Sequence, residues 1–117
     1  MLSKKNRLTK NRHFQFIYKK GSKVYSKYLY IVYASTKLKP IKVGVVVSNK
    51  VGKAVKRNKV KRRLRAVVAQ LLPNIKSDYN YIVVAKPEII ELDYKAIKKE
   101  VTNAFKKGGL LNSEKSD

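Results

Sequence analysis

The 117-residue sequence contains no cysteine and a single histidine, His13. Disulfide bonds, thiolate zinc sites and a cysteine nucleophile are therefore excluded. No apolar run approaches the roughly 18 residues that cross a bilayer. The basic segment 1–7 is not followed by the apolar core of a signal peptide. We therefore expect a cytoplasmic protein with no membrane partner.

Acidic residues are scarce and occur only in the last third of the chain. The chain has 29 lysines and arginines against 7 acidic residues, a formal net charge of +22. The first acidic residue is Asp78, so the preceding two-thirds of the chain is uniformly cationic. A compact domain with this charge repels itself and favours a polyanionic partner, for which nucleic-acid phosphates are the usual candidate. A membrane-surface protein is the alternative, but it would favour a helix with bulky apolar anchors.

Hydrophobic residues make up 44% of the chain, which is enough for the core of a single small domain. Periodicity and turn residues predict helices over residues 12–19, 55–72 and 94–107, and strands over 24–35, 41–48 and 79–85. A further short strand is possible near residues 20–23 or 50. These elements predict an α/β (α+β) fold with a mixed sheet. We expect residues 1–5 and 110–117 to be mobile.

Turn and capping residues set the expected boundaries. Asn11 is a candidate N-cap of the first helix and Gly21 its end, while Asp93 is a candidate cap of the last helix. Pro73 ends the long helix. The short connection 36–40 favours antiparallel pairing of strands 24–35 and 41–48.

The long helix has one apolar face and one cationic face. At 100° per residue, its apolar side chains form one stripe made of Val60, Leu64, Val67, Val68 and Leu71. The opposite arc carries Asn58, Lys59, Lys61, Arg62 and Arg65. A solvated helix usually mixes charges of both signs, and no acidic residue lies nearby. The arc therefore favours binding to phosphates over simple solvation, with arginine forks as ligands.

Aromatic residues mark a second candidate surface. Phe14 and Tyr18 lie one helical turn apart, and Tyr28 and Tyr30 alternate with other apolar residues in the first strand. Aromatic rings among lysines suit an unpaired nucleic-acid strand, because every base can stack on them. The alternative is that Phe14 and Tyr18 are ordinary core residues.

Three segments together resemble a known family. The motif Arg57-Asn58, Lys61-Arg62, Arg65 follows a Gly-Lys-Ala-Val-Lys lead-in at 52–56, Val43-Gly44-Val45 precedes it, and Arg7, Lys10, Phe14, Tyr18 and Gly21 occupy the N-terminal pattern. This arrangement resembles the bacterial ribonuclease P protein subunit over nearly the whole chain. The resemblance implies the order α-β-β-β-α-β-α, with a left-handed β-α-β crossover that runs against the general rule.

The resemblance also implies a function. Proteins of that family join a catalytic RNA, the ribonuclease P RNA, and the complex removes the 5′ leader of precursor tRNA. The RNA carries the chemistry with Mg²⁺ that it mainly holds itself, so no protein side chain is implied as catalytic or metal-binding. The expected partners are the catalytic RNA and precursor tRNA, with no obligate protein partner.

Residue roles follow from the resemblance. It implies RNA contacts for Lys53, Lys56, Arg57, Asn58, Lys59, Lys61, Arg62 and Arg65. It implies a leader-binding cleft made of Phe14 and Tyr18, with Tyr28, Tyr30, Val32, Arg7 and Lys10 beside them. Lys59 stands where arginine is common in the family, which keeps the charge but loses the fork. Tyr18 stands where phenylalanine is common.

Rival functions remain to be weighed. An autonomous nuclease needs acid–base groups or paired carboxylates. His13 reads as a solvent-facing helix residue, and Glu88, Glu91 and Asp93 fall in a predicted loop and cap. A helix-turn-helix would need a helix before the basic helix, where a strand is predicted. A ribosomal-type RNA-binding protein or RNA chaperone shares the charge and stays the alternative.

Overall fold

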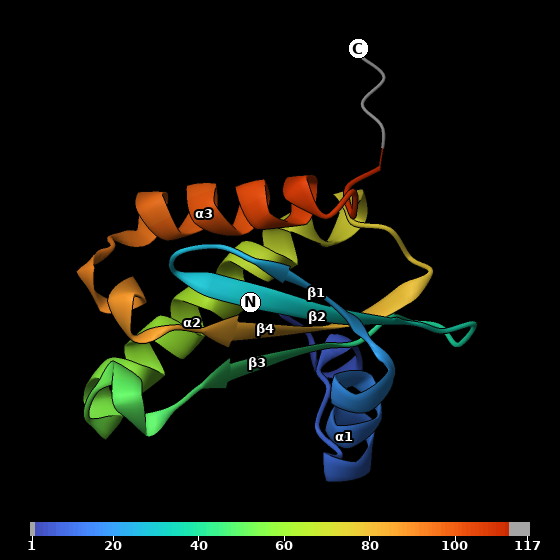
Figure 1. Ribbon diagram of the computed structural model, residues 1–117, viewed down its shortest axis with the longest axis horizontal. Coiled ribbons are helices and arrows are strands. Elements are labelled where there is room, and N and C mark those ends of the chain that lie inside the picture. The colour runs from blue at the N-terminus through green and yellow to red at the C-terminus, as the bar shows by residue number, and fades with distance from the viewer. Residues whose placement is uncertain (1, 113–117) are drawn as a thin grey trace.

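Within residues 2–112, which the computed structural model describes, the chain forms a four-stranded mixed sheet with helices on both faces (Figure 1). Its main elements are α1 (Asn11–Lys20), β1 (Ser22–Tyr25), β2 (Leu29–Ser35), β3 (Val43–Val47), α2 (Ala54–Leu71), β4 (Tyr79–Ala85) and α3 (Tyr94–Lys107). Short 3-10 segments join them: η1 (Lys4–Asn6), η2 (Asn49–Val51), η3 (Leu72–Asn74) and η4 (Pro87–Glu91). The order α-β-β-β-α-β-α is the one that the resemblance implied. Over this range no helix combines the length and hydropathy needed to span a membrane.

The strand order in the sheet is β1-β2-β4-β3. β4 pairs antiparallel with β2 and parallel with β3. The predicted antiparallel pairing of the second and third strands is therefore wrong, because β4 lies between them. The side chains of β4 from Tyr81 to Ala85 are buried on both faces, which places it at the centre of the sheet.

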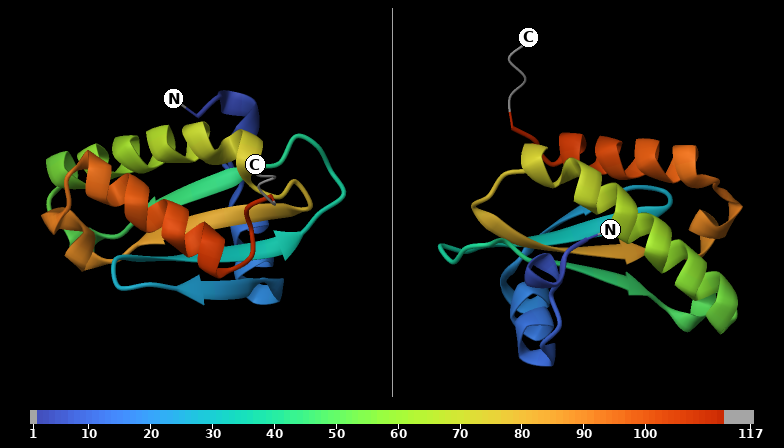
Figure 2. Two further views of the ribbon diagram at one scale, coloured as in Figure 1. Left: turned by 90° about the horizontal axis from the view of Figure 1, so that it is seen from above. Right: turned by 180° about the vertical axis from the view of Figure 1, so that it is seen from behind.

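The crossover from β3 through α2 to β4 is left-handed, as the resemblance implied and against the general right-handed rule (Figure 2). Seen from the helix side of the sheet, α2 runs along the outer side of β3, and α3 covers the middle of the sheet. α2 consequently has α3 on one flank, and the N-terminal segment lies beside its other flank (Figure 2).

The predicted strand 24–35 is in fact a hairpin. The backbone N–H of Ser26 donates to the Leu29 carbonyl at 2.9 Å, and the Ser26 hydroxyl donates to the same carbonyl at 2.9 Å. This turn separates β1 from β2, so an additional short strand does precede the first long one. Sequence alternation missed the break because the residues on both sides of it have high strand propensity.

Two apolar clusters lie on opposite faces of the sheet. Leu29 and Ile31 of β2 pack against α2 and α3, while Val32 and Ala34 pack with Ile17 of α1 on the other face. The alternation follows from the two-residue period of a strand. The five residues of the predicted α2 stripe are all buried, which confirms the expected orientation of that helix.

Helix ends partly match the expected boundaries. Asp93 caps α3, since its carboxylate accepts from the Ala96 N–H at 2.9 Å. Asn11 is inside α1, and the cap is Lys10 without a side-chain hydrogen bond, so that expectation is wrong. Gly21 follows the end of α1 as expected. A Cβ there would lie 2.5 Å from the Ile17 carbonyl oxygen and 2.8 Å from that of Tyr33, so the position requires glycine.

The two ends of the described chain are packed. Leu2 and Leu110 are each 1% exposed, and the Asn6 side-chain amide donates to the Ile41 carbonyl at 2.9 Å. The expected mobility of residues 1–5 and 110–117 stays a prediction, although Leu2 and Leu110 are packed in the core. Residues 1 and 113–117 lie outside the described range.

Candidate nucleic-acid interface

The outward face of α2 carries a continuous group of cations. Lys53 precedes the helix, and Lys56, Asn58, Lys59 and Arg62 on it are exposed. Lys61 and Arg65 are half-buried on the same arc. α2 itself contains no acidic residue, and no side chain caps its N-terminus. The helix dipole and the side chains therefore add to one positive potential.

Two arginines of α2 also hold the protein together. Arg57 is half-buried, and its Nη1 donates to the Gly52 carbonyl at 2.7 Å. Gly52 has a φ of 152°, a conformation that favours glycine. Arg63 donates from Nη1 to the Leu92 carbonyl at 3.4 Å. The resemblance implied an RNA contact for Arg57, and the structure shows that one arm of its guanidinium is fixed to the loop before the helix.

On the opposite face of the sheet, α1 places Phe14 directly over Gly44 of β3. A Cβ at position 44 would lie 2.5 Å from Cε1 of the Phe14 ring, so only glycine leaves room for the ring. Phe14 is half-buried against the cluster beneath α1. It is thus both a core contact and part of the surface.

Three tyrosines extend this surface across β1 and β2. Tyr18 is 36% exposed, and burial together with the neighbouring Tyr30 raises the pKa of its hydroxyl. The rings of Tyr30 and Tyr25 lie 5.3 Å apart between centroids. Lys86 lies 5.8 Å from the Tyr25 ring centroid. We call Phe14, Tyr18, Tyr25 and Tyr30 the aromatic patch.

Four other predicted cleft residues have different surroundings. Tyr28 packs on the cluster beneath α2 and α3, away from Phe14, because it lies in the hairpin turn instead of the strand. Val32 is fully buried and offers no surface. Arg7 bridges to β3 and donates from Nε to the Leu2 carbonyl at 3.1 Å. Lys10 is exposed at the start of α1.

β3 connects the aromatic patch to the cationic helix. Gly44 beneath Phe14 lies near its start, Val46 on the same face lies further along, and η2 then leads into α2. Five strand residues span roughly 16 Å. In Figure 1, α1 and the N-terminal end of α2 lie near opposite ends of β3. One extended strand of nucleic acid is long enough to reach both surfaces.

Sequence reasoning missed three members of this region, Tyr25, Val46 and Lys86. Tyr25 is 52% exposed and Val46 half-buried on the patch side of the sheet. The position of Tyr25 between Lys23 and Lys27 was a usable signal in the sequence. Lys86 follows β4, and no local pattern distinguishes it from other lysines.

The chain offers poor ligands for a divalent metal at either surface. Among the described residues, no three histidine, aspartate or glutamate side chains gather into a possible metal site. Carboxylates and carbonyls are the ligands that Mg²⁺ prefers, and neither α2 nor the aromatic patch carries an acid. The described side chains at these two surfaces therefore do not fit a resident Mg²⁺.

These features define a small, strongly basic α+β protein with a cationic helix and a separate aromatic patch joined by one strand.

Comparisons with known proteins identify its family. Residues 2–109 match the family model described as Ribonuclease P. The ribonuclease P protein component of Bacillus mycoides is 33% identical over 116 residues, covering 97% of this chain and all of the relative. That of Streptococcus agalactiae is 34% identical over 110 residues, covering 94% and 100%.

A solved structure agrees with the sequence relatives. The ribonuclease P protein of Staphylococcus aureus matches with a TM-score of 0.85 at 30% identity, covering 92% of this chain and 98% of that one. The chain therefore belongs to the ribonuclease P protein family, as a protein component of the ribonuclease P ribonucleoprotein in tRNA processing.

Proposed function

We propose that this protein binds the catalytic RNA of ribonuclease P through α2 and the 5′ leader of precursor tRNA through the aromatic patch. Binding at both surfaces assists the endonucleolytic removal of the leader. The observation that carries this proposal is the position of the two surfaces at the two ends of β3. One surface suits phosphates in a structured RNA, and the other suits the bases of a single strand.

The cationic helix supports the RNA-docking half of the proposal. Its exposed lysines and Arg62 offer charge-assisted hydrogen bonds to phosphate oxygens, and Asn58 adds an amide for a base edge or ribose hydroxyl. Arg57 has fewer free donors, because its Nη1 already donates to the Gly52 carbonyl. We therefore assign Arg57 a double role, in RNA contact and in fixing the loop that starts the helix.

The aromatic patch supports the leader half. The Phe14 ring is held in place by the glycine beneath it, so stacking of a base costs little side-chain entropy. The Tyr18 hydroxyl is protonated at neutral pH and does not repel phosphates, and burial raises its pKa further above the ordinary value of 10.0. Val32 supports the patch from beneath, and Tyr28 belongs to the other side of the sheet.

The chemistry of cleavage belongs to the RNA in this proposal, with Mg²⁺ held there. The protein contributes affinity and position, which lowers the metal concentration needed because its cations share the neutralisation of phosphates. We expect this to take place in the cytoplasm, with no obligate protein partner.

The test is a cleavage assay on precursor tRNA at low Mg²⁺, with the bacterial catalytic RNA alone and then with this protein. We expect a higher rate or tighter substrate binding with the protein present. An Arg62→Ala, Lys59→Ala double variant is the matched control, since both residues are exposed and their loss leaves the core intact. No gain from the unsubstituted protein would leave the alternative, an RNA-binding protein or chaperone without a role in cleavage.

A further inference from the structure

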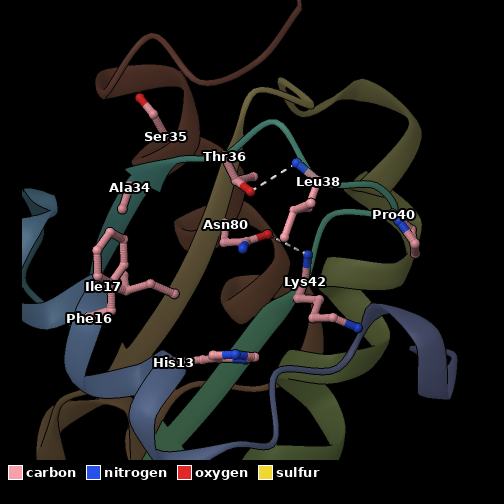
Figure 3. Close-up of a pocket in the computed structure, with 10 residues that line it drawn as sticks. All are labelled: His13, Phe16, Ile17, Ala34, Ser35, Thr36, Leu38, Pro40, Lys42 and Asn80. Carbon is pink, nitrogen blue, oxygen red and sulfur yellow. Dashed lines mark hydrogen bonds between the residues drawn. The ribbon is translucent and has the colours of Figure 1, made fainter.

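A hollow lies on the flank of α1 that carries His13 and Phe16 (Figure 3). It has a volume of about 190 Å³ and lies between α1 and the loop that joins β2 to β3. Its walls include Phe16, Ile17, Ala34, Leu38 and Pro40, and its polar lining includes His13, Lys42 and Asn80. We call this hollow the flank pocket. Neither the resemblance nor the comparisons assign it a role.

We propose that the flank pocket receives one unpaired base of an RNA strand that continues over α1 from the aromatic patch. This inference rests on the proposed function, because it requires that the protein bind single-stranded RNA at the patch. It gives the protein a second site, which binds another base of the same RNA strand.

The size of the flank pocket favours a single ring system. A protein cavity on the order of 150 Å³ is known to hold benzene, and this hollow of about 190 Å³ is slightly larger. A stable contact with a second protein would need roughly 800 Å² from each partner, far more than one pocket provides. One planar ligand of the size of a base is the occupant that fits.

The chemistry of the lining also suits a base. Phe16 is 55% exposed and Leu38 77% exposed, so both present apolar surface to solvent. The Asn80 Oδ1 accepts from the Lys42 N–H at 2.8 Å. This bond orients the amide so that its NH₂ group is turned into the hollow (Figure 3). An apolar slot with a fixed amide donor can stack a ring and bond one of its acceptors.

Charge along the path favours a nucleic-acid strand over an uncharged aromatic ligand. The crest of α1, on the side away from Ile17, carries Arg12, Gln15 and Lys19, all exposed. Lys42 lies at the rim of the hollow. α1 contains no acidic residue. A helix with its side chains is about 10–12 Å wide, so a strand that crosses this crest brings its phosphates over two cations before it reaches the pocket.

The position of side chains on α1 links the two sites. Phe14 and Tyr18 are separated from His13 and Phe16 by the buried Ile17, which faces the sheet. Each flank of the helix therefore presents aromatic surface, with the cationic crest between them. His13, which the sequence placed in solvent, is half-buried and lines the flank pocket.

The absence of tryptophan from the chain allows a direct test. A Phe16→Trp variant has one indole at the mouth of the flank pocket, and a base stacked there quenches its fluorescence. The probe is a dye-labelled single-stranded RNA oligonucleotide, whose anisotropy reports binding independently. A second oligonucleotide of equal length replaces its bases by abasic residues. Asn103→Trp, on the exposed side of α3, is the control.

We expect the RNA to quench Trp in the Phe16→Trp variant but not in the Asn103→Trp control. The abasic strand should bind through its phosphates without quenching. We also expect Phe16→Ala to weaken RNA binding about fivefold or more, the loss of one base–aromatic stack. Phe16→Tyr should restore the affinity. Phe16 is largely exposed, so neither change should lower the melting temperature.

Three outcomes would overturn the inference. If RNA binds but leaves the indole unquenched, and Phe16→Ala binds RNA with full affinity, the flank pocket does not bind a base. The proposed function then stands. Equal quenching by the abasic strand means that only the backbone passes this flank. No binding of RNA to the unsubstituted protein, seen by anisotropy, overturns both the proposed function and this inference.

Discussion

The Phe14 ring lies so close to Gly44 that a Cβ at position 44 would be 2.5 Å from its Cε1 atom. Helix α1 and strand β3 are thus fitted to each other at one point. Phe14 keeps part of its ring in solvent while the rest is packed on backbone. This contact fixes the aromatic patch relative to the strand that leads to α2.

Gly44→Ala should therefore displace the Phe14 ring. We expect a loss of about 1–3 kcal/mol in the free energy of unfolding, the usual cost of an overpacked contact, and weaker binding of precursor tRNA. Denaturant unfolding and a binding titration measure the two effects. A Gly44→Ala, Phe14→Leu double variant should recover stability but not binding. Equal stability of Gly44→Ala and the parent would contradict the contact.

Phe14→Ala tests the assignment of the leader. We expect it to weaken binding of precursor tRNA by about 1–3 kcal/mol, the range for one base stacked on an aromatic ring, and to leave mature tRNA nearly unaffected. The comparison requires both RNAs to be titrated against each variant at one salt concentration. Equal losses for both RNAs would mean that Phe14 acts through the core alone.

Arg62 and Arg63 form a matched pair on α2, since they are neighbours with different surroundings. Arg62 is exposed, whereas Arg63 is half-buried and donates to the Leu92 carbonyl. Arg62→Ala should lower the slope of log affinity against log salt by about one unit. Arg63→Ala should instead lower the free energy of unfolding by about 0.5–1.5 kcal/mol. Affinity measured across a salt series, with thermal melts, separates the two; an unchanged slope for Arg62→Ala rules out a phosphate contact there.

Tyr81 predicts how stability depends on alkaline pH. Its ring is fully buried and its hydroxyl donates to the Lys76 carbonyl at 2.5 Å. Burial raises the pKa of this hydroxyl well above its ordinary value of 10.0. The unfolded chain therefore loses the proton at a lower pH than the folded protein, so stability falls as pH rises above about 10.

Tyr81→Phe should flatten this dependence, since the group that titrates is removed. It should also be slightly less stable at neutral pH, by roughly 1 kcal/mol for the lost hydrogen bond. Unfolding free energies of both proteins from pH 8 to 11 provide the measurement. All other residues are the same in both proteins, so the difference between the two curves is the relevant quantity. Parallel curves would show that Tyr81 does not contribute.

Local patterns predicted much of this fold. The α2 stripe from Val60 to Leu71 matches the structure, because burial of one face imposes the helical period on the sequence. The strand Tyr79–Ala85 also matches, because its aromatic and β-branched residues favour a strand. The Asp93 cap was also predicted correctly, because the cap and the N–H that it accepts from are three residues apart. The antiparallel pairing of strands 24–35 and 41–48 was wrong, since pairing depends on which strand fills the space between them, and that strand comes later in the chain.

Part of the candidate interface could likewise be predicted from local patterns, and part could not. A run of cations on one helical arc, with no acid near it, determined the α2 surface from sequence alone, because charge and helical period are both local properties. Tertiary structure decided that Arg57 also binds Gly52, that Tyr28 lies on the other side of the sheet, and that Tyr25 joins Tyr30. It also decided that both flanks of α1 present aromatic surface. The loop before α2, the hairpin turn and the packing of α1 on the sheet set these relations, and no period in the sequence records them.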